Sequence, residues 1–145
     1  MDMKRLVIGT IVGAVILHVT GYLIFDVAAA DFYNANRGPA DAYRDLPMQL
    51  PLAVANLAYG ALLTLGIMSR NGAPSLAGGA IVSAVIGYLV WLHADLVFYS
   101  YMTTRPLPVV IVDPLLEIVH AGIGGAVIAA VLARVPKGAA IQPAE

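Results

Sequence analysis

Four long runs of apolar residues dominate this sequence and limit what it can fold into. They cover residues 6–27, 50–68, 76–98 and 109–132. Each run is close to the ~20 residues that a helix needs to cross the hydrocarbon core of a bilayer. A spanning segment must satisfy its own backbone hydrogen bonds, so each run predicts a transmembrane helix. The expected fold is an all-α, integral membrane four-helix bundle.

The composition agrees with a chain that lies almost wholly in a membrane. Of the 145 residues, 60% are hydrophobic and 12% are charged, whereas soluble domains average roughly 25% charged residues. Residues 1–145 are expected to form a single transmembrane domain, with a polar connection at 28–46 and a frayed tail at 136–145. The formal net charge of −1 shows no basic excess, so no nucleic-acid partner is implied.

Prolines indicate where the last three helices begin. Pro51, Pro74 and Pro108 lie near the expected first turns, where a missing backbone N–H costs least. For the last run a second interpretation stays open, in which Asp113 is the N-cap and Pro114 the first helical residue. Both versions are long enough to span a bilayer.

The distribution of lysine and arginine predicts how the chain is oriented. Short cytoplasmic connections of membrane proteins carry an excess of these residues. Five of the eight lie on the side of the two termini, and three lie on the opposite side. They are, in that order, Lys4, Arg5, Arg70, Arg134 and Lys137, then Arg37, Arg44 and Arg105. We therefore expect both termini in the cytoplasm. The connection with Asp31, Asp41, Asp45, Tyr33 and Tyr43 then lies outside.

Short matching blocks indicate an internal repeat. Gly-Tyr-Leu and Phe-Tyr recur in both halves at one offset, and a slightly shorter offset aligns positions in the other two helices. The matched pairs are 21–23 with 87–89, 32–33 with 98–99, Asn56 with His120, and Gly60 with Gly124. They predict two repeated helical hairpins, related by a pseudo-two-fold axis along the membrane normal. Chance similarity between helices rich in small residues is the alternative.

Polar and ionisable residues within the apolar runs are the main indication of function. A charge at the bilayer centre costs from roughly 2.5 kcal/mol upward, so such groups usually face the bundle interior and are paired. Those of this chain lie between the centre and the outer side, which predicts a titratable polar pocket in the outer half. The residues expected to line it are Glu117, His120, Asp95, His18, Asp113, Asn56, Tyr22, Tyr99 and Asp26.

Glu117 and His120 form the centre of the predicted pocket. They share one helix face and are only about 4.5 Å apart along the axis at 1.5 Å per residue. Such a pair can share a proton, although a purely structural ion pair is the alternative. We expect Asp95 and His18 to be their partners from the third and first helices.

The residue types limit the chemistry of the pocket. Without cysteine there is no thiolate metal site and no disulfide. Glu117-x-x-His120 has the spacing found in di-metal bundles, but those need two such pairs and two further glutamates, so no metal site is predicted. A bis-histidine haem would need two of His18, His93 and His120 to face each other among carboxylates. The cofactor stays open.

Three classes of function remain. The favoured one is a module that binds or transports a small molecule or a proton. The alternatives are a small membrane enzyme that uses acid–base or metal-dependent chemistry on a lipid-soluble substrate, and an accessory subunit of a larger membrane complex. Expected partners are the lipid bilayer, a small-molecule ligand, and a second copy or a larger complex. The Gly9-x-x-x-Gly13 spacing fits a homodimer, although packing within the chain is favoured.

Part of the sequence resembles small four-helix bacterial inner-membrane proteins catalogued as domains of unknown function. The likeness rests on residues 99–113, Tyr-Ser-Tyr-Met-Thr-Thr-Arg-Pro-Leu-Pro-Val-Val-Ile-Val-Asp, and on the stretch from Phe25-Asp26 to Phe32-Tyr33. It extends over about half of the chain. This resemblance implies a protein of the bacterial inner (plasma) membrane, and it carries no activity and no catalytic residues.

Overall fold

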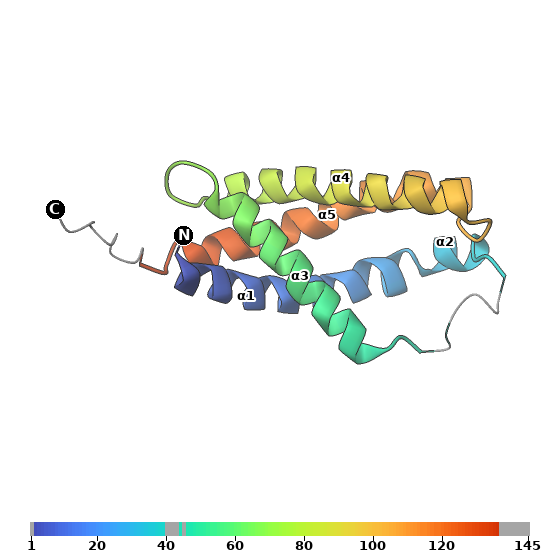
Figure 1. The fold of residues 1–145 in the computed structure, drawn as a ribbon, viewed down its shortest axis with the longest axis horizontal. Coiled ribbons are helices and arrows are strands. Elements are labelled where there is room, and N and C mark those ends of the chain that lie inside the picture. Colours follow the sequence, from blue (N-terminus) through green and yellow to red (C-terminus); the bar gives the residue numbers. More distant parts are fainter. Residues whose placement is uncertain (1, 40–43, 45, 137–145) are drawn as a thin grey trace.

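The computed structural model describes residues 2–39, 44 and 46–136, and every regular element within them is a helix (Figure 1). The elements are α1 (Met3–Gly21), the π-helical segment η1 (Tyr22–Ala28), α2 (Ala30–Ala35), α3 (Gln49–Met68), α4 (Leu76–Tyr101) and α5 (Leu107–Leu132). Four segments are long and apolar enough to cross a membrane, namely Met3–Ala28, Gln49–Met68, Leu76–Tyr101 and Leu107–Leu132. The predicted all-α four-helix fold is confirmed, and the chain is a multi-pass membrane protein.

The helix ends differ from the predicted ones by a few residues. Asp2 caps α1 by accepting a hydrogen bond from the Arg5 amide at 3.1 Å, so this helix begins before the apolar run. α5 continues through Pro114, which excludes the version of this helix that begins there. The predicted polar connection contains α2, which the apolar pattern did not indicate. Asp41, Tyr43, Asp45, Lys137 and residues 137–145 of the predicted frayed tail lie outside the described residues.

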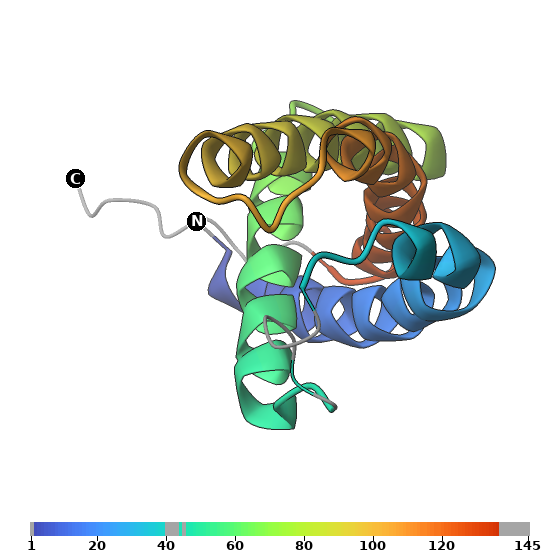
Figure 2. The same cartoon turned by 90° about the vertical axis from the view of Figure 1, so that its right-hand side faces the viewer.

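The four long helices pack as two antiparallel pairs, α1 with α3 and α4 with α5, and the pairs meet mainly where α1 lies against α5. In Figure 2, α4 lies at the top and α1 at the bottom, α5 runs down one flank between them, and α3 runs down the other. Figure 1 places the start of α1, the end of α5 and the α3–α4 turn at one end of the bundle. The opposite end, here called the α2 end, carries α2 and the α4–α5 loop.

Glycines allow both helix pairs to approach closely. A Cβ atom on Gly60 would lie 2.7 Å from the carbonyl oxygen of Thr10 and 2.8 Å from the amide nitrogen of Ala14. Gly79 and Gly125 form the corresponding contact between α4 and α5. Gly9 and Gly13 face α3, so this GxxxG pair packs within the chain. The repeat itself stays a prediction.

Candidate functional site

A carboxylate with no exposure to solvent lies halfway along α5. Glu117 is 0% exposed, and donors from three helices surround it. The Tyr59 hydroxyl on α3 donates to Oε1 at 2.7 Å, and the Trp91 indole on α4 donates to Oε2. His120 Nδ1 lies 2.9 Å from Oε1 and 3.1 Å from Oε2. We call Tyr59, Trp91, Glu117 and His120 the Glu117 cluster.

The other ring nitrogen of His120 shows how many protons the pair holds. Nε2 is 2.9 Å from the main-chain carbonyl oxygen of Leu17 on α1. A carbonyl oxygen only accepts hydrogen bonds, so Nε2 carries a proton. The contact between Nδ1 and Glu117 then holds one more proton, either on the imidazole or on the carboxyl group. All four spanning helices therefore contribute to a single proton-binding pair.

Two glycines make room for this cluster. A Cβ atom on Gly21 would lie 3.4 Å from His120 Nε2, and one on Gly87 would lie 2.7 Å from the Tyr59 hydroxyl oxygen. Gly87 also approaches Glu117, whose Cγ would be 3.2 Å from the added atom. These are the two glycines of the repeated Gly-Tyr-Leu block, and each lets a polar side chain reach the bundle interior.

A second group of polar side chains lies toward the α2 end. Arg105, in the α4–α5 loop, donates through Nε to Asp95 Oδ1 at 2.8 Å. Its Nη2 contacts both Asp95 and Asp113, and the Tyr33 hydroxyl on α2 donates to Asp113. Asp95 is 1% exposed, and its Oδ2 has no hydrogen-bond partner among the described residues. We call Tyr33, Asp95, Arg105 and Asp113 the Arg105 cluster.

Two members of the Arg105 cluster lie outside the spanning helices, and both keep their protons. Burial raises the pKa of the Tyr33 hydroxyl, and the hydrogen bond to Asp113 and its charge raise it further. Burial lowers the pKa of Arg105, but Asp113 and Asp95 outweigh this effect and raise the pKa above its usual value. The cluster therefore combines one fixed cation and one neutral donor with two carboxyl groups.

The two clusters are stacked along the same pair of helices. Trp91 and Asp95 are separated by four residues on α4, and so are Asp113 and Glu117 on α5. Four residues of α-helix rise about 6 Å, so the Arg105 cluster lies one turn closer to the α2 end. The interior of the bundle thus contains two adjacent titratable layers.

The structure brings together only part of the predicted pocket. Glu117 pairs with His120, as their helical spacing suggested. Asp95 and Asp113, both expected in the pocket, lie together through Arg105. The expected partnership of Asp95 with Glu117 is wrong, because Asp95 lies one turn away and binds Arg105. Trp91 lies one turn before Asp95 on α4, and it is Trp91 that contacts Glu117 from this helix.

The remaining predicted residues lie outside both clusters. His18 is exposed and its Nδ1 is 3.3 Å from the amide nitrogen of Asn56, so the expected contact with Glu117 is also wrong. On α1 the main chain of Leu17 serves instead. Tyr22, Asp26 and Tyr99 are exposed as well. The i, i+4, i+8 stripe of His18, Tyr22 and Asp26 thus faces away from the bundle interior.

Four members of the two clusters were not among the residues expected to line the pocket, namely Tyr33, Tyr59, Trp91 and Arg105. Trp91 and Asp95 share a helix face, which was a usable signal. Arg105 precedes a helix that begins with two prolines and was counted only as a loop charge. Nothing in the local pattern around Tyr59 or Tyr33 indicates their partners, since both contacts join distant segments.

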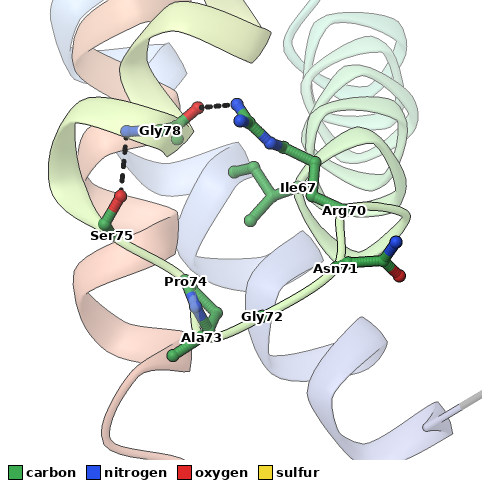
Figure 3. A pocket seen from close by; sticks show the side chains of 9 residues that line it. Ile67, Arg70, Asn71, Gly72, Ala73, Pro74, Ser75 and Gly78 are labelled. Atoms are coloured by element: carbon green, nitrogen blue, oxygen red, sulfur yellow. Dashed lines mark hydrogen bonds between the residues drawn. The ribbon is translucent and has the colours of Figure 1, made fainter.

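Other parts of the described chain offer less chemistry. Within residues 2–39, 44 and 46–136, no group of three or more His, Cys, Asp or Glu side chains could hold a metal ion. A small hollow at the α3–α4 turn is lined by Arg70, Ser75 and Gly78 among others (Figure 3). Arg70 donates to the Gly78 carbonyl oxygen at 3.4 Å, and Ser75 Oγ accepts from the Gly78 amide at 3.1 Å. No carboxylate lines this hollow, so the Glu117 cluster and the Arg105 cluster are the candidate site.

Comparison of the chain with protein-family models, with curated proteins and with solved structures gave no match. The function is therefore argued from the geometry of the two clusters.

Proposed function

We propose that this membrane protein binds and releases a proton at the Glu117–His120 pair, and that this proton serves the binding or transport of a small molecule or is itself the transported species. The observation that carries the proposal is a fully buried carboxylate in contact with an imidazole and with two further donors. Intramembrane ionisable groups are costly and typically mark ion or proton pathways.

The arrangement couples the proton to the packing of the helices. When the proton lies on His120, both carboxylate oxygens accept hydrogen bonds, and the charges of the pair cancel. When that proton leaves the pair, the carboxylate keeps the indole and phenol donors but loses the imidazole donor and the balancing positive charge. Because α1, α3, α4 and α5 all contact the pair, gain or loss of a proton changes the relative energies of alternative helix arrangements.

The single tryptophan gives a direct test. Trp91 donates to Glu117, so its fluorescence should respond to the charge of the carboxyl group. In nanodiscs, titration between about pH 4 and pH 9 should give a sigmoidal change for the natural protein and none for Glu117→Gln. His18→Gln is the matched control, because this histidine is exposed, and it should titrate like the natural protein. A signal that persists in Glu117→Gln, or that is missing in the natural protein, would contradict the proposal.

A role as a subunit of a larger complex is the second candidate, and the outward-facing polar residues favour it. His18, Asp26 and His93 are exposed on spanning helices. Ionisable groups facing lipid are costly, so another chain covering this surface would remove the cost. Native mass spectrometry from lipid nanodiscs tests this candidate. A stoichiometric partner would support it, and a monomer extracted under mild conditions would exclude it.

We also propose that the protein lies in the bacterial inner membrane with both termini in the cytoplasm. Lys4 and Arg5 in the first turn of α1, Arg70 after α3 and Arg134 after α5 belong to one end of the bundle (Figure 1). An excess of such residues is typical of cytoplasmic ends. At the α2 end, Arg105 forms ion pairs with two carboxylates, so this end has less unpaired positive charge.

A further inference from the structure

One aromatic ring contacts a member of each polar cluster. The centroid of Phe25 is 5.5 Å from that of His120, in an edge-to-face arrangement at 89°. The Phe25 centroid is also 6.0 Å from that of Tyr33, whose hydroxyl donates to Asp113. Phe25 thus touches one member of the Glu117 cluster and one member of the Arg105 cluster.

The Arg105 cluster has the properties of a proton acceptor next to this ring. It combines two carboxyl groups with a single guanidinium group, so one negative charge is not balanced within the cluster. Asp95 is almost wholly buried, and its Oδ2 has no donor among the described side chains. A buried charged oxygen without a donor is costly, and a proton bound to Oδ2 would remove the charge.

The backbone that carries Phe25 is unusual. Phe25 lies in η1, a π-helical segment of residues Tyr22–Ala28 that directly continues α1. π-Helical turns are rare and occur frequently at functional sites. A shift of one residue between π-helical and α-helical hydrogen bonding would turn the ring by about 100° around the helix axis. Leu17, whose carbonyl oxygen binds His120, lies on the same continuous helix, five residues before η1 begins.

We propose that Phe25 is a gate between the Arg105 cluster and the Glu117–His120 pair, and that a change of register in η1 opens it. This inference rests on the proposed function, because it regulates proton access to the same pair. With the ring in place, an apolar group separates the two layers and excludes water from His120. With the ring displaced, a proton passes from the carboxyl group of Asp95, directly or through water, to Glu117 or His120. No other bond changes, and Asp95 becomes a carboxylate again.

Hydrogen–deuterium exchange at Trp91 tests the gate without any transport assay. A protein with one tryptophan has one indole N–H signal in a nitrogen–proton correlation spectrum, and this N–H points at Glu117. Its exchange in deuterated buffer reports access of water to the cluster. Phe25→Ala should accelerate the exchange at least about tenfold, which corresponds to a barrier lower by about 1.4 kcal/mol.

Phe32 provides the matched control. Its ring also packs against Tyr33, with centroids 5.3 Å apart, but among the described residues it has no ring contact with His120. Phe32→Ala should therefore leave the exchange rate within about twofold of that of the natural protein. Phe25→Leu preserves an apolar plug and should remain slow, which separates loss of the barrier from general loosening of the bundle.

Equal exchange rates in Phe25→Ala and Phe32→Ala would overturn the gate, as would a natural protein whose indole exchanges as fast as free indole. The fluorescence titration distinguishes this failure from failure of the proposed function. A normal titration together with an unchanged rate in Phe25→Ala removes only the gate. A natural protein without a titration removes the proton site, and the gate with it.

Discussion

How completely each intramembrane carboxyl group is hydrogen-bonded depends on the donors that neighbouring segments supply. Glu117 contacts one phenol, one indole and one imidazole, whereas Asp95 has a guanidinium group on one oxygen only. Burying a charge away from water costs several kcal/mol unless its lone pairs accept hydrogen bonds. The difference between a carboxylate with donors on both oxygens and one with a bare oxygen thus comes from partners at distant positions in the sequence.

At this scale we predict the effect of removing one donor from Glu117. Tyr59→Phe deletes the hydroxyl that lies 2.7 Å from Oε1. It should lower the free energy of unfolding by about 1.5–3 kcal/mol, the range for hydrogen bonds to charged groups. Tyr99→Phe is the matched control, because Tyr99 is 46% exposed, and it should change stability by less than about 0.5 kcal/mol. Reversible unfolding in mixed detergent micelles measures both values. Similar effects of the two variants would show that the Tyr59 hydroxyl does not support Glu117.

The helices act as pairs whose spacing is determined by small residues. α4 and α5 approach each other at Gly79 and Gly125, and α1 and α3 at Gly13 and Gly60. Close approach gives van der Waals contact where the lipid supplies no hydrophobic driving force between helices. It also allows a polar side chain on one helix to contact a partner on another. The Tyr59 hydroxyl reaches Glu117 from α3 because Gly87 leaves its path open.

At the scale of the helix we predict that Gly60 tolerates no side chain. Gly60→Ala would place a methyl group 2.7 Å from Thr10 O and 2.8 Å from Ala14 N, which are main-chain atoms of α1. The helices must separate, and we expect a loss of about 1–3 kcal/mol in stability. Gly122→Ala is the control on another helix, since its nearest neighbours would be 3.8 Å away. Its unfolding in the same micelles should match that of the natural protein, and an equally stable Gly60→Ala would refute the close crossing.

The whole molecule has two ends of different character. One end has the start of α1, the end of α5 and the α3–α4 turn (Figure 1). There Arg5 is buried and donates to the carbonyl oxygen of Leu132 at 3.1 Å, satisfying one of the last carbonyl groups of α5. The α2 end holds the Arg105 cluster, with two carboxylates from spanning helices. The proposed proton site lies between these ends, one helical turn farther from the α2 end than the Arg105 cluster.

At the scale of the molecule we predict that the α2 end is periplasmic. The chain has no cysteine, so single cysteines can be introduced at two exposed asparagines, Asn34 on α2 and Asn71 in the α3–α4 turn. An impermeant maleimide should label Asn34→Cys in intact cells. It should label Asn71→Cys only after the membrane is permeabilised. The reverse labelling pattern would show that the termini face outward.

By itself the sequence determined the four spanning helices, their approximate ends and the pairing of Glu117 with His120. Apolar length and helical spacing are local properties, and a bilayer imposes the same rules on each segment separately. The tertiary structure decided which polar faces meet. It placed Tyr59, Trp91 and the Leu17 carbonyl around the pair. It also paired Asp95 with Arg105 and left His18, Tyr22 and Asp26 exposed. These outcomes depend on helix rotation, on glycine contacts and on the π-helical turn at Phe25, which join residues far apart in the chain. Apart from the helix face that Trp91 shares with Asp95, no local pattern indicated them.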